Sequence, residues 1–185
     1  VLTAAWQAYG QLGFDGRGTH TLHWLPLSHV FGRIGLYLDW IAGSVGHYAR
    51  GVEHLPDDLA LARPHVLFAV PQVLKRLRAR IESGVNARPR MARIAFASLR
   101  RLAVGANAVA PIAARLALQA FVRRRVFAAV HAPLGRRLAV VVVGGAPVDA
   151  GDKRYFESLG VAVREGFGMT ETAGVAAVQP LRARS

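Results

Sequence analysis

The 185-residue sequence has no cysteine, and its 11 acidic residues are outnumbered by 24 basic ones. The absence of cysteine excludes a disulfide framework, a thiolate metal site and a cysteine nucleophile, and it fits a reducing compartment. No run of 18 apolar residues is free of charge, and the N-terminus lacks the basic-then-apolar pattern of a signal peptide. We therefore expect a cytoplasmic protein. Its 52% hydrophobic content excludes a disordered chain.

Acidic residues are scarcest in one central segment. Residues 75–137 hold fifteen basic residues and one acid, Glu82, whereas the rest of the chain holds nine basic and ten acidic residues. The formal net charge of +13 therefore belongs to this segment. Of the 24 basic residues, 22 are arginine, and they alternate with apolar positions in helix-like runs such as VLKRLRARI and FVRRRVFAAV.

Three interpretations of this basic segment stay open. The simplest is a solvated helical face in an arginine-biased protein. An anionic membrane surface would attract the same arginines while the apolar residues enter the interface, which would place the protein peripherally at the inner membrane face. Nucleic acid ranks last, and no specific nucleic acid is expected, because the segment lacks an RNP-type aromatic motif, a zinc-finger spacing and an evident helix-turn-helix.

The pattern along the chain predicts an α/β fold, a parallel sheet with flanking helices, because short apolar runs alternate with helical patterns. Strands are expected at 45–49, 65–70, 138–143 and 161–165, and a short apolar stretch covers 21–27. Helices are expected at 1–12, 29–43, 55–63, 71–82 and 149–159, with two or three more in the basic segment, broken near 84–89 and 105–111. Ser28 and Asp149 are the expected N-caps of two of these helices.

Two turns follow expected strands, at the edge where parallel sheets bind ligands. In VVVVGGAPV, Gly144 and Gly145 leave the backbone bare for a flat ring or a phosphate. A glycine pair after a strand is weak evidence alone, since most such pairs form tight turns.

The second turn, REGFGMTET, is more specific because glycines, an aromatic ring, hydroxyls and an acid occur within a few residues. Phe167 can stack on a base, Thr170 can donate to a phosphate oxygen, and Glu171 can hold Mg²⁺. Taken alone, Glu171 would be a solvated loop acid.

Four motifs in order resemble one family. LPLSHVFGR at 25–33, LARPHVLFAVPQVLKRL at 61–77, VVGGAPV and REGFGMTETAG are similar to motifs of the AMP-forming acyl-CoA synthetases in the adenylate-forming superfamily, and among them to the long-chain fatty-acid–CoA ligases. The resemblance covers nearly the whole chain. Phe167 stands where the family usually has Tyr, so the stacking face is kept and the hydroxyl is lost.

The resemblance also implies roles for individual residues. The nucleotide site would comprise Gly144, Gly145, Ala146, Pro147, Glu165, Gly166, Phe167, Gly168, Met169 and Thr170. The acyl site would comprise His29, Phe31, Gly32, Arg33 and Gly144. Catalysis would rest on His29, Thr170 and Glu171, with Glu171 as the Mg²⁺ ligand. The other histidines, His20, His23, His47, His54, His65 and His131, have no metal-site spacing and are expected to be structural.

The chemistry implied by the resemblance has two half-reactions. A fatty-acid carboxylate attacks the α-phosphate of ATP, giving acyl-adenylate and pyrophosphate, and the thiol of CoA then displaces AMP. The implied partners and cofactors are therefore the fatty acid, ATP, Mg²⁺ and CoA. Medium-chain, aryl and bile-acid substrates are the near alternatives, and a carrier protein is the alternative acceptor.

Parts of the family pattern are absent from the sequence. Nothing resembles the Ser/Thr/Gly-rich phosphate loop expected before Val1, and neither Lys75 nor Lys153 lies in a motif like that of the C-terminal domain. We therefore expect residues 1–185 to be a partial AMP-binding domain, the central part of a large N-terminal domain, with a basic helical insertion at about 75–137. Such a chain alone is not expected to complete adenylation. The alternative is a truncated, non-catalytic protein that binds anionic membranes or nucleic acid.

Overall fold

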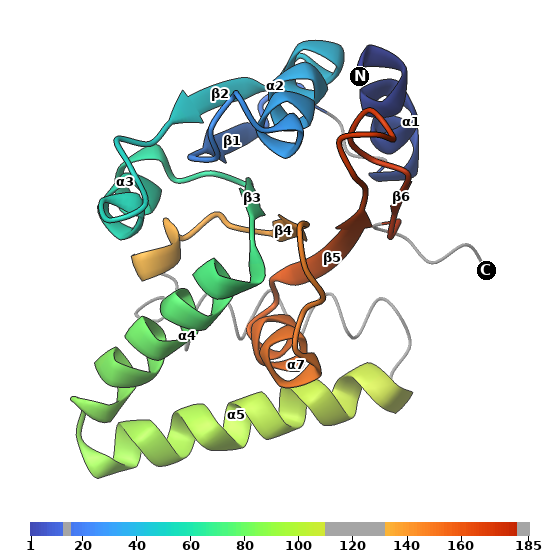
Figure 1. The fold of residues 1–185 in the computed structure, drawn as a ribbon. Helices are drawn as coiled ribbons and strands as arrows, with labels where there is room; N and C mark the ends of the chain where they lie inside the picture. Colours follow the sequence, from blue (N-terminus) through green and yellow to red (C-terminus); the bar gives the residue numbers. More distant parts are fainter. Residues whose placement is uncertain (13–15, 110–131, 181–185) are drawn as a thin grey trace.

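The computed structural model describes residues 1–12, 16–109 and 132–180, and its centre is a six-stranded sheet (Figure 1). The strand order is β2-β1-β3-β4-β5-β6, and all neighbours are parallel except β5 and β6, which are antiparallel. The strands are β1 (His20–His23), β2 (Val45–Tyr48), β3 (Val66–Ala69), β4 (Val140–Val143), β5 (Ala162–Phe167) and β6 (Ala177–Val178). The register pairs Val143 at the end of β4 with Glu165 on β5, so the two expected turns emerge side by side.

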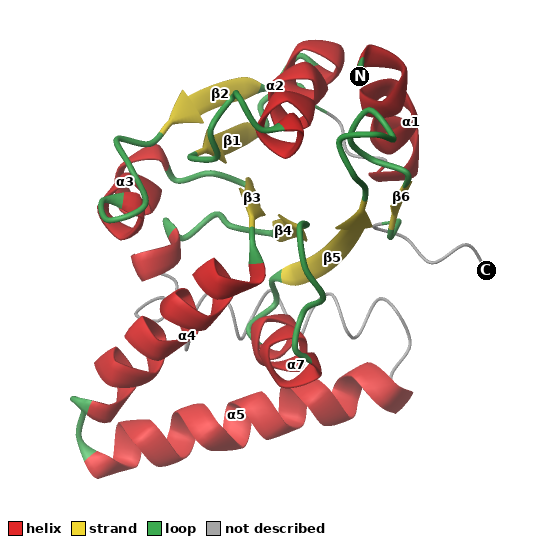
Figure 2. Ribbon diagram, in the orientation of Figure 1, coloured by secondary structure: helices red, strands yellow, loops and turns green. Residues whose placement is uncertain are grey.

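Helices cover both faces of this sheet (Figure 2). They are α1 (Leu2–Leu12), α2 (Val30–Ala42), α3 (Leu55–Ala62), α4 (Pro71–Asn86), α5 (Arg90–Val109) and α7 (Ala150–Ser158), with a 3-10 turn η1 (Ala132–Leu134). Helices α1 and α2 pack on one face, and α3, α4 and α7 pack on the other. Helix α5 lies outside α4 and α7, which it contacts.

Successive side chains of the central strands pack into two hydrophobic cores, one on each face of the sheet. On β3, Leu67 packs toward α3 and α4, whereas Phe68 packs toward α1 and α2. On β4, Val141 and Val142 divide in the same way. All these side chains are buried. This two-sided burial explains why the strands appear in the sequence as continuous apolar runs, as buried parallel strands do.

The structure confirms the expected α/β fold, corrects one expected helix cap and adds one strand. Ser28 is not the N-cap of α2: His29 is, because its backbone is extended and its ring accepts the N–H of Phe31. Strand β6 was not predicted, because two residues give too short a pattern to recognise. Asp149 caps α7 as expected, and its carboxylate accepts the N–H groups of Gly151 and Asp152, which hold its pKa below the usual range.

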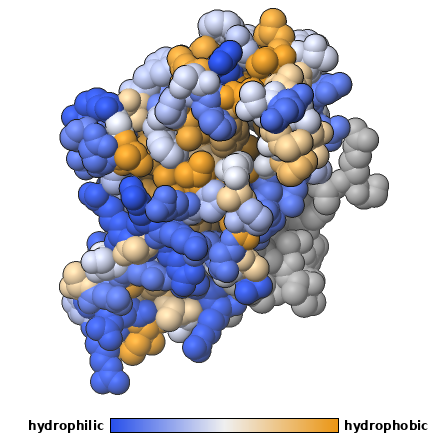
Figure 3. Space-filling model, in the orientation of Figure 1, coloured by the Kyte–Doolittle hydropathy of each residue, from blue (hydrophilic) through white to orange (hydrophobic). Residues whose placement is uncertain are grey.

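The basic segment begins with α4 and α5, which form a long hairpin at the lower edge of the molecule in Figure 1. Hydrophilic side chains dominate this region of the surface (Figure 3). Helix α4 ends at Asn86 and α5 runs through Gly105 to Val109, and residues 110–131 of the segment lie outside the described residues. Within the described part of the chain, no helix has the length and apolarity needed to cross a membrane.

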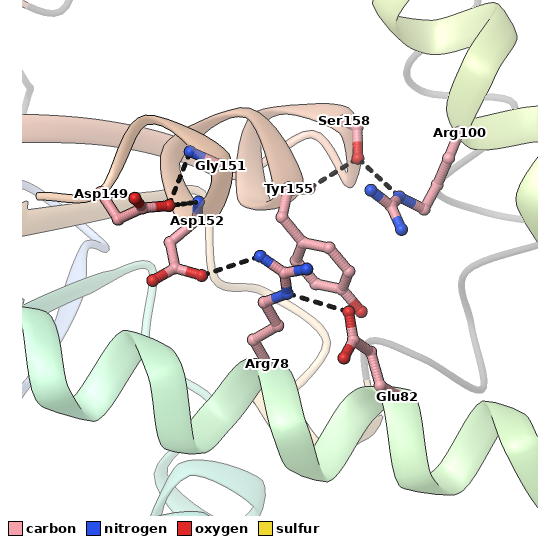
Figure 4. Close-up of polar contacts among 8 residues, drawn as sticks. All are labelled: Arg78, Glu82, Arg100, Asp149, Gly151, Asp152, Tyr155 and Ser158. Carbon is pink, nitrogen blue, oxygen red and sulfur yellow. Dashed lines mark hydrogen bonds and ion pairs between the residues drawn. The ribbon is translucent and has the colours of Figure 1, made fainter.

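A polar network fastens α4 and α5 to α7 (Figure 4). Arg78 on α4 donates to Asp152 on α7 at 2.9 Å and to Glu82 on its own helix at 2.9 Å, and both contacts raise the pKa of its guanidinium. Arg100 on α5 donates to the Ser158 hydroxyl at 3.1 Å. The ring of Tyr155 lies between the two guanidinium groups, which are 4.8 and 4.2 Å from its centroid.

The buried hydroxyl of Tyr155 has no hydrogen-bond partner among the described residues, and burial raises its pKa to about 12. Removing it relieves a desolvation cost, so Tyr155→Phe is expected to leave stability unchanged or to raise it by about 1 kcal/mol. Tyr155→Ala should lose about 3–5 kcal/mol, since it also opens a cavity. The Tyr155 hydroxyl ionises near pH 10 in the unfolded chain but only near pH 12 in the folded protein. The wild-type protein should therefore lose stability as pH rises from 10 toward 12, and Tyr155→Phe should lack this contribution. Urea unfolding at pH 7 and pH 11 measures both effects, and a Tyr155→Phe protein with the wild-type loss at high pH would contradict the assignment.

Candidate functional site

Two adjoining cavities open where β4 and β5 end. The first, called the apolar cavity, has a volume of about 210 Å³ and lies between α1, α2 and the sheet. The second, called the outer cavity, has a volume of about 710 Å³ and lies between the β4–α7 loop and β6. The two share one wall, formed by Gly145, Gly166, Phe167, Gly168, Met169 and Val178. A single elongated ligand with an apolar part and a flat polar part can therefore occupy both.

Two glycines of the apolar cavity leave little or no room for a side chain. A Cβ on Gly144 would lie 3.1 Å from the ring of Phe31, which lines the apolar cavity. A Cβ on Gly168 would lie 1.5 Å from the carbonyl oxygen of Gly174, a separation that no packing can accommodate. The bare backbone at Gly168 thus lets residues 169–174 fold back against the end of β5.

The segment after Gly168 is a hydrogen-bonded turn. The Thr172 hydroxyl accepts the N–H of Met169 at 2.9 Å, and the N–H of Gly174 donates to the Met169 carbonyl at 3.0 Å. Thr172 thus holds the turn, whereas Thr170 lines the apolar cavity. Glu171 follows it as an exposed carboxylate outside the lining of both cavities.

His29 lies at the start of α2 and lines the apolar cavity. Its Nδ1 accepts the N–H of Phe31 at 3.2 Å, which is the capping interaction of the helix. When Nδ1 of a neutral imidazole accepts, the proton resides on Nε2. The cap therefore leaves Nε2–H as the donor that His29 can offer to a ligand oxygen.

The outer cavity has one charged wall. Lys153 on α7 donates from Nζ to Glu165 Oε1 at 2.9 Å and to Gln179 Oε1 at 3.0 Å. The ammonium group of Lys153 holds the pKa of the Glu165 carboxyl below its usual range. Glu165 and Gln179 both line the cavity, and Phe167, with 65% of its surface exposed, forms a flat apolar face of it. The cavity thus combines a surface for stacking with fixed hydrogen-bond acceptors.

The structure brings most of the sequence-predicted site residues together. Residues lining at least one cavity are His29, Phe31, Gly144, Gly145, Ala146, Pro147, Glu165, Gly166, Phe167, Gly168, Met169 and Thr170. Gly32 and Arg33 lie outside both linings. Gly32 packs against the Pro26 carbonyl, and Arg33 donates to the carbonyls of Leu27 and Ser28, so it braces the loop before α2.

Sequence reasoning missed Lys153 and Gln179. No motif marks either residue, because the contact joins α7 to the short strand region of β6. The spacing of Lys153 four residues after the Asp149 cap places it on the first turns of α7, but which neighbour it meets depends on the pairing of β5 with β6.

Several histidines outside the cavities bond other side chains of the sheet region. The buried His23 bonds Asp39 Oδ2 at 2.5 Å, and the same oxygen accepts the Thr21 hydroxyl at 2.6 Å. His20 bonds His47 at 2.8 Å, and burial followed by the charge of His20 lowers the pKa of His47. No group of three or more His, Asp or Glu side chains in the described ranges is arranged to hold a metal ion by itself. His131 lies outside the described residues.

The comparisons with known proteins agree with this arrangement. A family model described as "AMP-binding enzyme" matches residues 1–185. A curated relative, the peroxisomal acyl-CoA ligase 891 of Penicillium roqueforti (strain FM164), is 28% identical over an alignment of 174 residues, and the match covers 90% of this chain. The match covers 24% of that relative, so the chain spans about a quarter of its length.

Solved structures of similar fold come from several organisms. The N-terminal domain of FACL13 from Mycobacterium tuberculosis superposes with a TM-score of 0.61 at 16% identity, covering 95% of this chain and 33% of that one. The long-chain-fatty-acid-CoA ligase FadD1 of Archaeoglobus fulgidus has a TM-score of 0.61 at 14% identity, covering 97% and 29%. O-succinylbenzoate coenzyme A synthetase (MenE) of Bacillus subtilis, solved with ATP and magnesium ion, has a TM-score of 0.59 at 17% identity, covering 96% and 27%.

Proposed function

The chain belongs to the AMP-binding enzyme family, and from its two cavities we propose that it forms part of an ATP-dependent ligase that activates a long-chain fatty acid. The proposed products are the acyl-adenylate and then, with CoA, the acyl-CoA. The observation that carries this proposal is the wall shared by an apolar cavity and a cavity with a stacking face and fixed acceptors. An acyl-adenylate has the same two parts, joined at a phosphate.

In this proposal each cavity receives one part of the ligand. The adenine would lie in the outer cavity against Phe167, with its amino group donating to the acceptors at Glu165, and the acyl chain would enter the apolar cavity beside Phe31 and Gly144. His29 and Thr170 both line the apolar cavity, and in this proposal His29 Nε2–H and the Thr170 hydroxyl would donate to the carboxylate and the α-phosphate. Such fixed donors position two anionic reactants against their mutual repulsion.

A magnesium ion fits the proposed site through Glu171. Mg²⁺ is commonly held by one or two carboxylates together with substrate phosphates, and Glu171 is an exposed carboxylate next to Thr170. The ion would supply charge neutralisation at the phosphates, and Glu171 would hold it there.

The complete activity is proposed for a longer enzyme, because the chain spans only about a quarter to a third of the relatives described above. We propose that residues 1–185 contribute part of its adenylation domain and do not complete adenylation alone, and that the enzyme is cytoplasmic. If this chain alone turned over ATP and palmitate at an ordinary ligase rate, the proposal that it does not complete adenylation alone would be contradicted.

A series of acyl-sulfamoyladenosines tests the proposed function, since these compounds replace the phosphate of acyl-AMP with a stable sulfamate. The chain should bind the palmitoyl compound more tightly than the octanoyl and acetyl compounds in calorimetric titrations, because more apolar surface enters the apolar cavity. Equal affinities across the series would contradict the long-chain assignment. The absence of binding to every member would contradict adenylate binding by this chain.

Lys153→Met provides a specific prediction for the outer cavity. Without the ammonium group, the pKa of Glu165 should return toward its usual value and its carboxylate should lose its fixed orientation. The affinity for AMP should fall about threefold to tenfold, as expected for one charge-assisted hydrogen bond acting through another residue. Lys153→Arg should restore most of the affinity. If Lys153→Met binds AMP as tightly as wild type, the contact of Lys153 with Glu165 does not contribute to AMP binding.

A further inference from the structure

Helix α5 presents one side to the protein and the opposite side to solvent. Phe96 is buried and Arg100 reaches inward to Ser158, which fixes the inner side of the helix. With 3.6 residues per turn, Arg90, Met91, Ile94 and Arg101 then fall on the other side. We call these four residues the outer face of α5. Helix α5 itself lies along the lower edge of the molecule in Figure 1.

The outer face combines apolar and cationic side chains. Met91 and Ile94 are exposed over 75% and 50% of their surface, one turn apart. Arg90 and Arg101 flank them and are also exposed. Isolated apolar residues are ordinary on a surface, but two of them on the same side of a helix as two arginines match the mixed face of an interfacial helix.

The positive charge of this region is not neutralised within the described part of the chain. Arg88, Arg90, Arg93 and Arg101 make no ion pair with a carboxylate of the described residues, whereas the nearby acid Glu82 is engaged by Arg78. Arg90 and Arg101 belong to the outer face, and Arg88 and Arg93 lie near its N-terminal end, so this part of the surface is strongly positive. Its complement is a surface with many negative charges.

We propose that the outer face of α5 docks on an anionic lipid surface. The arginines would contact lipid phosphates, and the side chains of Ile94 and Met91 would enter the boundary between headgroups and acyl chains. Nucleic acid would satisfy the arginines as well, but a duplex backbone offers no apolar region in which the two aliphatic side chains can be buried. Exposed apolar residues at the centre of the face therefore favour lipid.

The location of the face is compatible with the two cavities. Helix α5 covers the side of the sheet opposite α1 and α2, which line the apolar cavity. Docking through α5 therefore leaves the apolar cavity uncovered. The proposal rests on the charge and exposure of α5 and does not depend on the proposed function.

Co-sedimentation with vesicles tests the proposal, using phosphatidylcholine alone and phosphatidylcholine mixed with phosphatidylglycerol. The wild-type chain should sediment with the mixed vesicles only, and less so as salt is raised. Arg90→Gln/Arg101→Gln should weaken binding roughly fivefold per arginine. Met91→Ser/Ile94→Ser should weaken it by about tenfold, since apolar burial is lost while charge is unchanged. All four positions are exposed on a helix, so unchanged thermal melting should accompany these losses.

Arg136→Gln/Arg137→Gln is the matched control, because it removes the same charge from an exposed turn outside the outer face. This control should bind mixed vesicles as wild type does. The proposal is overturned if the mixed vesicles are not bound, or if the control weakens binding as much as Arg90→Gln/Arg101→Gln. It is also overturned if Met91→Ser/Ile94→Ser has no effect on vesicle binding and duplex DNA of equal charge displaces the vesicles fully. The face would then bind any polyanion through its arginines and would not be specific for lipid.

Discussion

Gly168→Ala is expected to abolish binding of palmitoyl-sulfamoyladenosine while the sheet remains folded. The new Cβ would lie 1.5 Å from the Gly174 carbonyl oxygen, so residues 169–174 could no longer fold against the end of β5. Thr170 and the wall shared by the two cavities would move with that turn. We expect the affinity to fall by about a hundredfold or more, which corresponds to about 3 kcal/mol. Calorimetric titration measures it.

Gly84→Ala is the control for this experiment. Gly84 lies within α4, and a Cβ there would meet no atom within 4 Å. The substitution should leave ligand affinity unchanged and raise the free energy of unfolding by about 0.5–1 kcal/mol, because alanine is the better helix former. Wild-type affinity in Gly168→Ala would contradict the role given to the turn.

Asp39→Ala is expected to cause a loss of stability as large as that of Tyr155→Ala. The Asp39 carboxylate is buried in α2, and it accepts hydrogen bonds from Thr21 and His23 on β1 and from the Ser44 hydroxyl at 3.0 Å. Removing it leaves three polar side chains at a buried or half-buried position without their partner. Losses of about 3–5 kcal/mol are typical when one member of such a buried set is removed.

Urea unfolding of Asp39→Ala measures this loss, with Asp57→Ala as the control. Asp57 is an exposed helical aspartate whose contact with Arg80 is 3.7 Å long, so its removal should change stability by less than about 0.5 kcal/mol. Similar unfolding midpoints for the two variants would show that the Asp39 contacts do not join α2 to β1 energetically.

The sheet and most of the site could be predicted from the sequence because their signals are local. Continuous apolar runs such as 138–143 identify buried strands, and the glycine-bearing turns after two of them identify the ligand edge. The N-cap Asp149 was recognisable for the same reason, since its interaction reaches only two or three residues ahead.

The rest could not be predicted because it depends on contacts distant in sequence. The bond between Lys153 and Glu165 requires that α7 pack beside β5, and the bond to Gln179 requires the antiparallel return of β6. The cap of α2 was misplaced by one residue because Ser28 is the more common capping residue and His29 an unusual one. The Asp39 contacts likewise join β1 to a helix sixteen residues away and leave no motif.

The central claim is that one ligand spans both cavities, with adenine in the outer cavity and the acyl chain in the apolar one. The most direct measurement compares the affinities of AMP and palmitoyl-sulfamoyladenosine for wild type, Gly144→Val and Phe167→Ala. Gly144→Val places methyl groups beside Phe31, so it should weaken the palmitoyl compound about tenfold or more while leaving AMP unchanged. Phe167→Ala should weaken both ligands by a similar factor, because both stack their adenine on its ring. If Gly144→Val weakens both ligands equally, or if Phe167→Ala affects neither, the ligand does not lie across the two cavities as proposed.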